Sequence, residues 1–383
     1  MIAKRLEVFG FRNIGQANIE FSPGVNVLIG DNAQGKTNAL EAVYIFAGGK
    51  SFRAKSDREL LPFGENYGGI RLTMQSSLKK REDIMSFEYI SDDGRSAIKR
   101  TAKKNGTVER KIGDMLGTFR AVLFCPEHLA LVKGGPGERR SFLDIALSQI
   151  KPVYLKNLQR FHALLQERNK LLKDAREDRR IFDMTGELWA EQLSECAAYI
   201  TATRAEYTDT LSELVKENFR LMTGGRENPE LSFKSSAGSD IDPHDENGVR
   251  EKYFELYTTS SDREIAAGTT LWGVHRDDIM IELDSKEARL YASQGQDRSI
   301  ALSMKLSEGE ISEKISGESP VYLFDDVMSE LDESRRNFIL SRFDGGRQII
   351  ITSCEPEFFR YGELNIIKVE GGRYLFPEKG GSL

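Results

Sequence analysis

The chain has few cysteines and no long apolar run. Its three cysteines, Cys125, Cys196 and Cys354, are widely separated and form no metal-ligand spacing. This scarcity argues against a disulfide framework and favours a reducing compartment. No apolar run approaches the ~20 residues that cross a membrane. The stretch Met1–Glu7 reaches a charge before any apolar segment, so we expect no secretory signal. These absences predict a cytoplasmic protein with no membrane partner.

An excess of positive charge is also missing. The 383 residues carry 54 Lys and Arg against 60 Asp and Glu, for a net charge of −6. A surface that binds nucleic acid must therefore be a local basic patch. Two basic segments qualify, a loop that follows residue 49 and a hairpin that ends near residue 111. Their candidate DNA-binding residues are Arg53, Lys55, Lys99, Arg100, Lys103 and Lys104. A solvated hairpin with no ligand explains the second segment equally well.

The most informative stretch is residues 30–37, which fit the phosphate-loop pattern G-x-x-x-x-G-K-[ST] without a mismatch. A short apolar strand, Val25–Ile29, precedes it. A helix expected over Asn38–Phe46 follows and stops at two glycines. This order of strand, loop and helix distinguishes a nucleotide site from a chance match in a glycine-rich turn.

The chemistry of this loop suits a nucleoside triphosphate. Gly30 and Gly35 allow backbone N–H groups to face phosphate oxygens at a helix N-terminus. Lys36 supplies a positive charge, and the Thr37 hydroxyl can bind Mg²⁺. The predicted nucleotide-binding residues are Gly30, Asp31, Asn32, Ala33, Gln34, Gly35, Lys36, Thr37 and Asn38, with ATP and Mg²⁺ as cofactors.

A second acidic motif closes an apolar run near the C-terminus. Residues 321–324 are apolar and lead into Asp325 and Asp326, as expected for a buried parallel strand that carries carboxylates at its end. We predict that Asp325 binds Mg²⁺ together with Thr37, and that Asp326 polarises the attacking water. Lys36, Asp325 and Asp326 are thus the predicted catalytic residues. A strand that ends in two solvated aspartates is the alternative.

A further turn, Ser293-Gln294-Gly295-Gln296, precedes a helix expected over residues 299–313. A turn of this kind at a helix start is an anion-binding device. One nucleotide needs only one such loop, so we expect Ser293 and Gly295 to contact the γ-phosphate held by a second subunit. An ordinary helix cap is the alternative.

The remaining pattern predicts strands and long helices. We expect strands at Arg5–Phe11 and Ala17–Phe21 and an antiparallel meander over 67–111 with a turn at Asp92–Gly94. A helix over Glu138–Leu172 and a second one, resuming after an interruption at Asp183–Gly186, predict a helical hairpin. Shorter elements are expected as strands at 231–233, 279–283, 289–291 and 348–351 and a helix at 249–260.

The order of phosphate loop, insertion, signature turn, acidic strand and Ser329-Glu330-Leu331-Asp332 resembles the ABC-type ATPase heads. Within them the chain is most similar to the RecF family of SMC-like DNA-repair ATPases. The segments that carry this resemblance are Phe11-Arg12-Asn13, residues 30–38, Lys50-Ser51-Phe52-Arg53, Phe124-Cys125-Pro126-Glu127, His275-Arg276-Asp277-Asp278, residues 293–296 and residues 324–332.

The resemblance implies an α/β fold, an ATPase head with an antiparallel β subdomain and an inserted helical lobe that carries a short helical hairpin. We expect the ATPase lobe at residues 1–120 and 265–383 and the helical lobe at 121–264. It also implies an ATP-dependent homodimer that binds single- and double-stranded DNA in repair, replication and the SOS response. RecR with RecO, and indirectly RecA, are the implied partners, and ATP hydrolysis is slow and stimulated by DNA.

Some positions of the resemblance leave alternatives open. Arg12 and Asn13 match family positions near the nucleotide, and a structural role at the strand end is nearly as plausible. Asp326 and Ser353 stand where the wider ABC class carries Glu and a switch His, and no glutamine fits the Q-loop. A subunit of an ABC transporter and an ATP-gated scaffold without hydrolysis are the competing functions.

Overall fold

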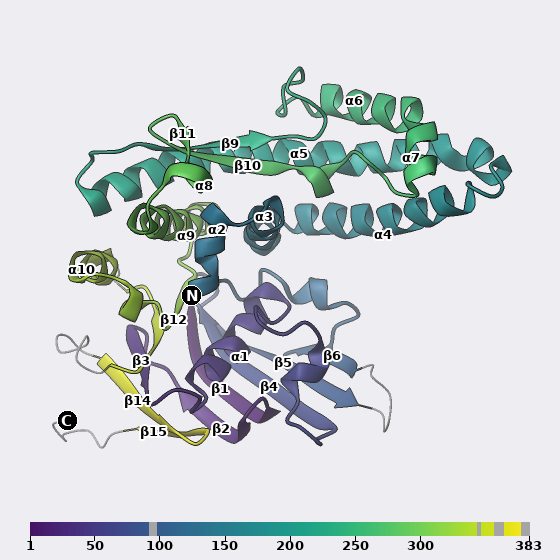
Figure 1. Ribbon diagram of the computed structural model, residues 1–383. Helices are drawn as coiled ribbons and strands as arrows, with labels where there is room; N and C mark the ends of the chain where they lie inside the picture. Colours follow the sequence, from purple (N-terminus) through teal and green to yellow (C-terminus); the bar gives the residue numbers. More distant parts are fainter. Residues whose placement is uncertain (92–97, 343–345, 356–363, 377–383) are drawn as a thin grey trace. The chain divides into compact units, whose positions relative to one another are not determined.

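The computed structural model describes residues 1–91, 98–342, 346–355 and 364–376. The chain forms two compact units: the first combines Met1–His128 with Glu308–Leu383, and the second is Leu129–Ser307 (Figure 1). Residues 265–307, which the sequence assigned to the ATPase lobe, therefore group with the helical lobe. They do so because β10 (Asp278–Leu283) pairs antiparallel with β9 (Pro229–Lys234) of that lobe.

An antiparallel sheet forms one layer of the first unit. Its strand order is β2-β1-β4-β5-β6-β7. The strands are β1 (Ile2–Phe11), β2 (Ile14–Glu20), β4 (Tyr67–Ser76), β5 (Arg81–Ser91), β6 (Ile98–Lys104) and β7 (Thr107–Val108). The predicted N-terminal strands and meander are confirmed, while the predicted turn at Asp92–Gly94 lies outside the described residues.

A second, mostly parallel sheet carries the phosphate loop. Its order is β15-β14-β3-β13-β12-β8. The strands are β3 (Val25–Ile29), β8 (Ala121–Phe124), β12 (Val321–Asp325), β13 (Ile349–Ser353), β14 (Leu364–Glu370) and β15 (Arg373–Leu375). Helix α1 (Lys36–Gly48) packs against strands of both sheets. It ends as predicted, because Gly49 adopts the left-handed conformation at φ 71°.

Long helices dominate the second unit. They are α3 (Pro136–Ile150), α4 (Pro152–Asp174), α5 (Arg180–Thr223) and α6 (Glu246–Thr259). The predicted single helix over 138–172 is wrong: it divides at Lys151, because Pro152 disfavours a helical conformation at the residue before it and starts α4. The predicted interruption at Asp183–Gly186 is also wrong, since α5 runs through these residues and the chain reverses between α4 and α5.

Short elements complete both units. They are η1 (Asp57–Leu60), η2 (Ile112–Met115), η3 (Pro126–Leu129), η5 (Met328–Glu330) and α10 (Glu333–Arg342) in or at the edge of the first unit, and α2 (Ala130–Lys133), α7 (Ser261–Ala267), η4 (Val274–Arg276), β11 (Lys286–Glu287) and α8 (Ala288–Tyr291) in the second. The predicted strand at 289–291 is therefore a helical turn. Helix α9 (Gln294–Ser316) crosses the boundary in sequence. Among the described helices, none combines the length and apolar character needed to cross a membrane.

Candidate nucleotide-binding site

The phosphate loop joins β3 to α1, and its glycines are required by a close backbone contact at Gly30 and by a left-handed backbone at Gly35. A Cβ atom on Gly30 would lie 2.2 Å from the Val369 carbonyl oxygen, and one on Gly35 would lie 3.1 Å from Asn13 Oδ1. Gly35 also adopts φ 115° as the N-cap of α1. Side chains other than hydrogen are strained at such angles. The loop therefore brings backbone N–H groups close to a helix N-terminus, the arrangement that binds phosphate.

Lys36 lies folded into this loop. Its Nζ donates hydrogen bonds to the carbonyl oxygens of Gly30 at 2.6 Å and Asp31 at 2.8 Å. A third contact joins Nζ to Cys354 Sγ at 3.3 Å. The residue is buried. The ammonium group is therefore held inside the loop by weak neutral acceptors, which a phosphate oxygen can replace with a charged one.

The two predicted magnesium ligands lie in direct contact. Thr37 Oγ1 donates a hydrogen bond of 2.7 Å to Asp325 Oδ1, and Thr352 Oγ1 donates to the same oxygen at 2.9 Å. Asp325 is buried at the end of β12, and this burial raises the pKa of its carboxyl group. The described residues contain no cluster of three or more His, Cys, Asp or Glu side chains that could hold a metal. One hydroxyl and one carboxylate suit Mg²⁺, which takes most of its ligands from phosphate and water.

Asp326 follows immediately with an unusual backbone. Its φ of 53° is left-handed, and its N–H donates a 3.0 Å hydrogen bond to Thr352 Oγ1. Left-handed conformations are uncommon for residues other than glycine and concentrate at functional sites. The turn directs the chain away from the sheet directly after Asp325. Asp326 thus lies at the carboxyl edge of the parallel sheet, where its predicted role requires it.

Arg12 and Arg53 both bind a buried carboxylate on α1. Arg12 forms a two-point pair with Glu41, with distances of 3.0 Å from Nε and 2.7 Å from Nη2, and Arg53 Nη2 lies 2.8 Å from the same carboxylate. Burial opposes ionisation of Glu41, but hydrogen bonds from Arg12 and Ser51 and the charge of Arg53 outweigh it and lower its pKa. The structure therefore gives Arg12 a protein partner that anchors α1.

Asn13 fastens the loop from the other side. Its Nδ2 donates to the Ala33 carbonyl at 3.0 Å, and its Oδ1 accepts from Asn38 Nδ2 at 2.7 Å. Arg53 also donates to Asn38 Oδ1 at 2.6 Å. The predicted nucleotide-contacting residues Asn13 and Asn38 thus shape the loop and the first turn of α1. For Asn13 this is the structural role that the sequence left open.

A third support comes from the β14–β15 hairpin, and no sequence motif indicated it. The backbone N–H of Gly372 donates to the Gln34 carbonyl at 2.9 Å, and that of Gly371 donates to Gln34 Oε1 at 2.6 Å. The Tyr374 hydroxyl donates to the Gly35 carbonyl at 2.9 Å. The pairing of β14 with β3 brings these residues to the loop, although more than 300 positions separate them. The hairpin is a part of the site that the sequence patterns did not predict.

The predicted DNA-binding residues do not form one free cationic surface. The prediction that Arg100 contacts DNA is corrected, because the side chain of Arg100 is only 6% exposed. Its guanidinium carbon lies 4.0 Å from the centre of the Phe87 ring, and Nη1 donates to the Gly49 carbonyl at 2.8 Å. Lys103 pairs with Glu88 at 2.6 Å, and Lys104 donates to Thr118 Oγ1 at 2.9 Å. Of the three remaining predicted residues, Arg53 pairs with Glu41 at 2.8 Å, and the side chains of Lys55 and Lys99 are exposed.

The predicted signature turn lies in the second unit and caps α9. The Ser293 N–H donates to Gln296 Oε1 at 2.6 Å, and the Gln296 N–H donates to Ser293 Oγ at 3.3 Å. This reciprocal pair is a capping box. Gln296 also contacts Glu227 through its amide nitrogen. The turn therefore presents the start of a long helix, with its serine already at the cap.

The His275–Asp278 motif has a structural role in the second unit. Asp277 is buried and pairs with Arg204 at 3.1 Å, while Asp278 forms a two-point pair with Arg139 at 2.7 and 2.9 Å. Burial lowers the pKa of His275 to about 4, so the ring is neutral at pH 7. Asp277 and Asp278 thus join α3, α5 and the start of β10, which accounts for their presence without a catalytic role.

Comparison with known proteins agrees with this geometry. The family model described as RecF/RecN/SMC N terminal domain matches residues 2–371. The chain is 39% identical over 380 residues to the DNA replication and repair protein RecF of Ruminiclostridium cellulolyticum, covering 97% of this chain and 98% of that protein. The chain belongs to the RecF family. The RecF protein of Acetivibrio thermocellus is 36% identical over 382 residues, covering 98% of this chain and all of that one.

Solved structures of the RecF family are also similar. The structure of the recombination mediator protein RecF-ATP in the RecFOR pathway superposes with a TM-score of 0.90 at 34% identity, covering 98% of this chain and 97% of that one. An SMC head bound to a domain of ScpA has a TM-score of 0.55 at 16% identity and 98% coverage of both chains, which shows a shared fold only. The predicted α/β ATPase-head fold and the resemblance to RecF are thereby confirmed.

Proposed function

We propose that this member of the RecF family is an ATP-dependent DNA-binding protein of recombinational repair and replication. The hydrogen bond between Thr37 and Asp325 carries the proposal, since it unites the phosphate loop with the acidic strand. Lys36 and the loop N–H groups bind the phosphates, and Thr37 and Asp325 hold Mg²⁺, which neutralises phosphate charge when bound. The similar RecF-ATP structure supports the choice of nucleotide.

Hydrolysis in this proposal is slow and acts as a switch. Asp326 orients the attacking water from the carboxyl edge of the sheet, and its side chain is one methylene shorter than the Glu of the wider ABC class. A shorter side chain holds the water less favourably, which lowers the rate. DNA stimulates the turnover, and hydrolysis releases the protein from DNA.

ATP also drives the proposed homodimer. Ser293 and the N–H groups at the start of α9 bind the γ-phosphate of the partner subunit, as expected of a helix N-terminus. The dimer binds gapped or junction DNA in single- and double-stranded form through exposed basic residues such as Lys55. RecR with RecO are the proposed partners that couple this state to RecA loading. The pathway named for the similar RecF structures supports this assignment.

Sedimentation velocity tests this function with the wild type, Ser293→Arg and Ser239→Arg. Ser239 lies in an exposed loop of the second unit and provides the matched control. With ATP and Mg²⁺, we expect the wild type and Ser239→Arg to dimerise and Ser293→Arg to stay monomeric while still binding ATP. Equal behaviour of all three proteins would reduce Ser293 to a helix cap and refute the composite site.

DNA affinity provides the second half of the test. ATP should raise the affinity of the wild type for gapped DNA, and added salt should lower it because phosphate contacts release counterions. Lys36→Ala should remove the ATP effect. A DNA affinity that responds to neither salt nor ATP would refute the switch.

A further inference from the structure

The outer face of the antiparallel sheet carries an unusual number of exposed apolar side chains. Strand alternation buries residues such as Leu6, Leu72 and Met85 on one face and directs their neighbours outward. The outward or edge positions include Phe9, Tyr67, Ile84, Ile90 and Val108, with exposures of 50%, 47%, 40%, 37% and 58%. Single exposed apolar residues are common, but a contiguous group marks an interaction surface.

Close backbone packing fixes two aromatic rings at one end of this face. Gly10 has φ 55°, and a Cβ atom there would lie 2.8 Å from the Tyr67 carbonyl oxygen. A Cβ atom on Gly68 would lie only 2.1 Å from the Gly10 carbonyl oxygen. The two glycines thus allow the strand ends to approach, and the rings of Phe9 and Tyr67 lie 5.6 Å apart at the adjacent positions. Rigid aromatic side chains lose little entropy on binding a partner.

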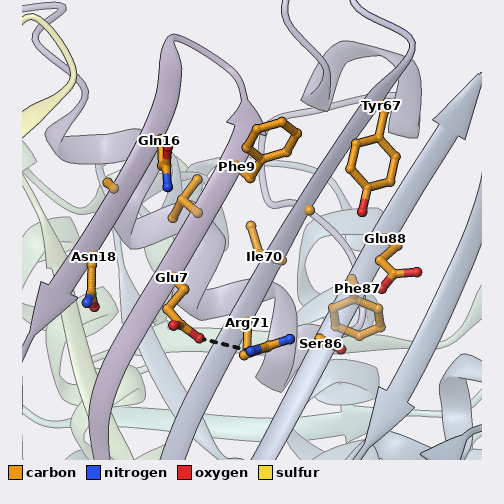
Figure 2. A pocket seen from close by; sticks show the side chains of 13 residues that line it. Glu7, Phe9, Gln16, Asn18, Tyr67, Ile70, Arg71, Ser86, Phe87 and Glu88 are labelled. Atoms are coloured by element: carbon orange, nitrogen blue, oxygen red, sulfur yellow. Dashed lines mark ion pairs between the residues drawn. The ribbon is translucent and has the colours of Figure 1, made fainter. Parts of the chain in front are cut away.

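A hollow lies between these rings and the charged residues further along the strands. Its volume is about 470 Å³, and Figure 2 shows Phe9 and Tyr67 at one end and Glu7 and Arg71 at the other. Gly69 faces Phe9 across β1 and Glu88 across β5, so a position without a side chain lies in the middle of the row. A second hollow of about 350 Å³ lies beside it and shares Arg71 and Glu88.

The charges on this sheet argue against a polyanion as the occupant. Glu7 lies 3.5 Å from Arg71, Glu88 lies 2.6 Å from Lys103, and Glu82 lies 2.5 Å from Lys4. These acids offset three bases of the sheet, and an extended DNA-binding face would need more unpaired ones. Lys99 is exposed on the same face opposite Ile90, and its charge also suits an acidic partner. Aromatic, aliphatic and arginine side chains together are instead typical of the centre of a protein interface.

Arg71 indicates the charge of the partner. Its side chain is 58% exposed, and its distance of 3.5 Å to Glu7 exceeds a normal charged hydrogen bond. Its guanidinium group can therefore donate two hydrogen bonds to a second carboxylate. Glu88, in contrast, already has a close basic partner in Lys103.

We propose that this face, defined by Phe9, Tyr67, Gly69, Arg71 and Glu88, docks an acidic, apolar segment of another protein. A leucine or aromatic side chain of that segment fills the hollow above Gly69 between Phe9 and Tyr67. A neighbouring Asp or Glu binds Arg71. The nucleotide site takes no part in this contact, so the proposal stands separately from the function above.

A library of short random peptides displayed on phage tests the proposal with the full-length, nucleotide-free protein. Selection on the wild type is followed by removal of phage that also bind a Phe9→Ser/Arg71→Glu double variant. We expect the remaining peptides to place Asp or Glu within a few residues of Leu, Phe or Trp. Each single variant should bind the selected peptide at least about tenfold more weakly.

Two controls make the result specific. Phe63→Ser removes a fully exposed phenylalanine elsewhere in the same unit and should leave peptide binding unchanged. Replacing the peptide carboxylate by lysine should weaken binding to the wild type and restore it to Arg71→Glu. All variants should keep the wild-type melting temperature and ATP binding, which separates a lost contact from a lost fold.

Several results would overturn the proposal. The face is not a peptide-docking surface if no peptide distinguishes the wild type from the double variant, or if the selected peptides are basic. Loss of oligo(dT) binding in Phe9→Ser would identify the face as a nucleic-acid surface. A smaller sedimentation coefficient of nucleotide-free Phe9→Ser would show that a second copy of the chain covers it.

Discussion

The hydroxyl of Tyr374 donates a hydrogen bond of 2.9 Å to the carbonyl oxygen of Gly35. The β14–β15 hairpin thereby holds Gly35, which caps α1 and shapes the phosphate loop. Burial raises the pKa of Tyr374, so its hydroxyl stays protonated and remains a donor. The conformation of the loop therefore depends on a contact far away in sequence.

Tyr374→Phe removes this hydrogen bond and keeps the ring. A hydrogen bond contributes about 0.5–1.5 kcal/mol, so we expect ATP to bind about two- to twelvefold more weakly. Titration with a fluorescent ATP analogue measures the change. Tyr67→Phe removes a hydroxyl from the outer sheet face and should have no effect. Equal ATP affinities of Tyr374→Phe and the wild type would contradict a positioning role for Tyr374.

ATP should protect Cys354 from alkylation. Its Sγ lies 3.3 Å from Lys36 Nζ and 3.0 Å from Asn32 Oδ1, and the residue is exposed, whereas Cys125 and Cys196 are buried. We expect N-ethylmaleimide to modify Cys354 first and ATP with Mg²⁺ to slow this reaction, as followed by mass spectrometry of the modified peptide.

Lys36→Ala provides the control for this protection experiment. The variant should lose protection by ATP because its loop no longer retains the phosphates. Labelling of wild-type Cys354 at the same rate with and without ATP would show that the nucleotide does not occupy the space beside Lys36.

Acid should destabilise the second unit through His275. Burial lowers its pKa from 6.5 to about 4. At a pH between these two values, His275 therefore binds a proton in the unfolded chain but not in the folded chain. The contribution of His275 to the free energy of unfolding is fully present above pH 6.5. It declines as the pH falls toward 4, by at most about 3 kcal/mol. His275→Gln should flatten this decline, whereas His244→Gln, at an exposed position, should not.

Tryptophan fluorescence measures this effect in one unit alone. Both tryptophans, Trp189 and Trp272, lie within residues 129–307. Thermal unfolding followed by fluorescence between pH 7 and pH 4.5 therefore reports on the second unit. The same acid-side decline in wild type and His275→Gln would rule out His275 as its source.

Loss of Arg204 should destabilise the second unit strongly. Its buried guanidinium group contacts Asp144 at 2.7 Å, Asp277 at 3.1 Å and Tyr154 at 2.9 Å. Arg204→Leu leaves the buried Asp277 without its cation, which costs about 3–5 kcal/mol. Arg160→Leu breaks an exposed pair with Glu195 and should cost less than about 1 kcal/mol. Urea unfolding followed by tryptophan fluorescence should separate the two, and equal midpoints would contradict the burial argument.

The sequence by itself determined the elements whose chemistry is local. A phosphate loop needs its glycines, lysine and threonine within eight positions, and a buried strand needs a short apolar run, so both can be recognised in isolation. The same holds for the alternation of the antiparallel sheet. The predicted break at Asp183–Gly186 was wrong because helix α5 tolerates Gly186 within its length, and local propensity does not decide such a case.

Tertiary structure decided the contacts between distant segments. Thr37 and Asp325 are separated by 288 positions, and only the order of parallel strands brings their oxygens to 2.7 Å. Charge counting grouped Arg100 with exposed lysines, but the sheet buries it against Phe87. Tyr374 carries no motif, and its role follows from the pairing of β14 with β3. Local sequence sets which chemical groups are available, whereas burial and strand order set which of them meet.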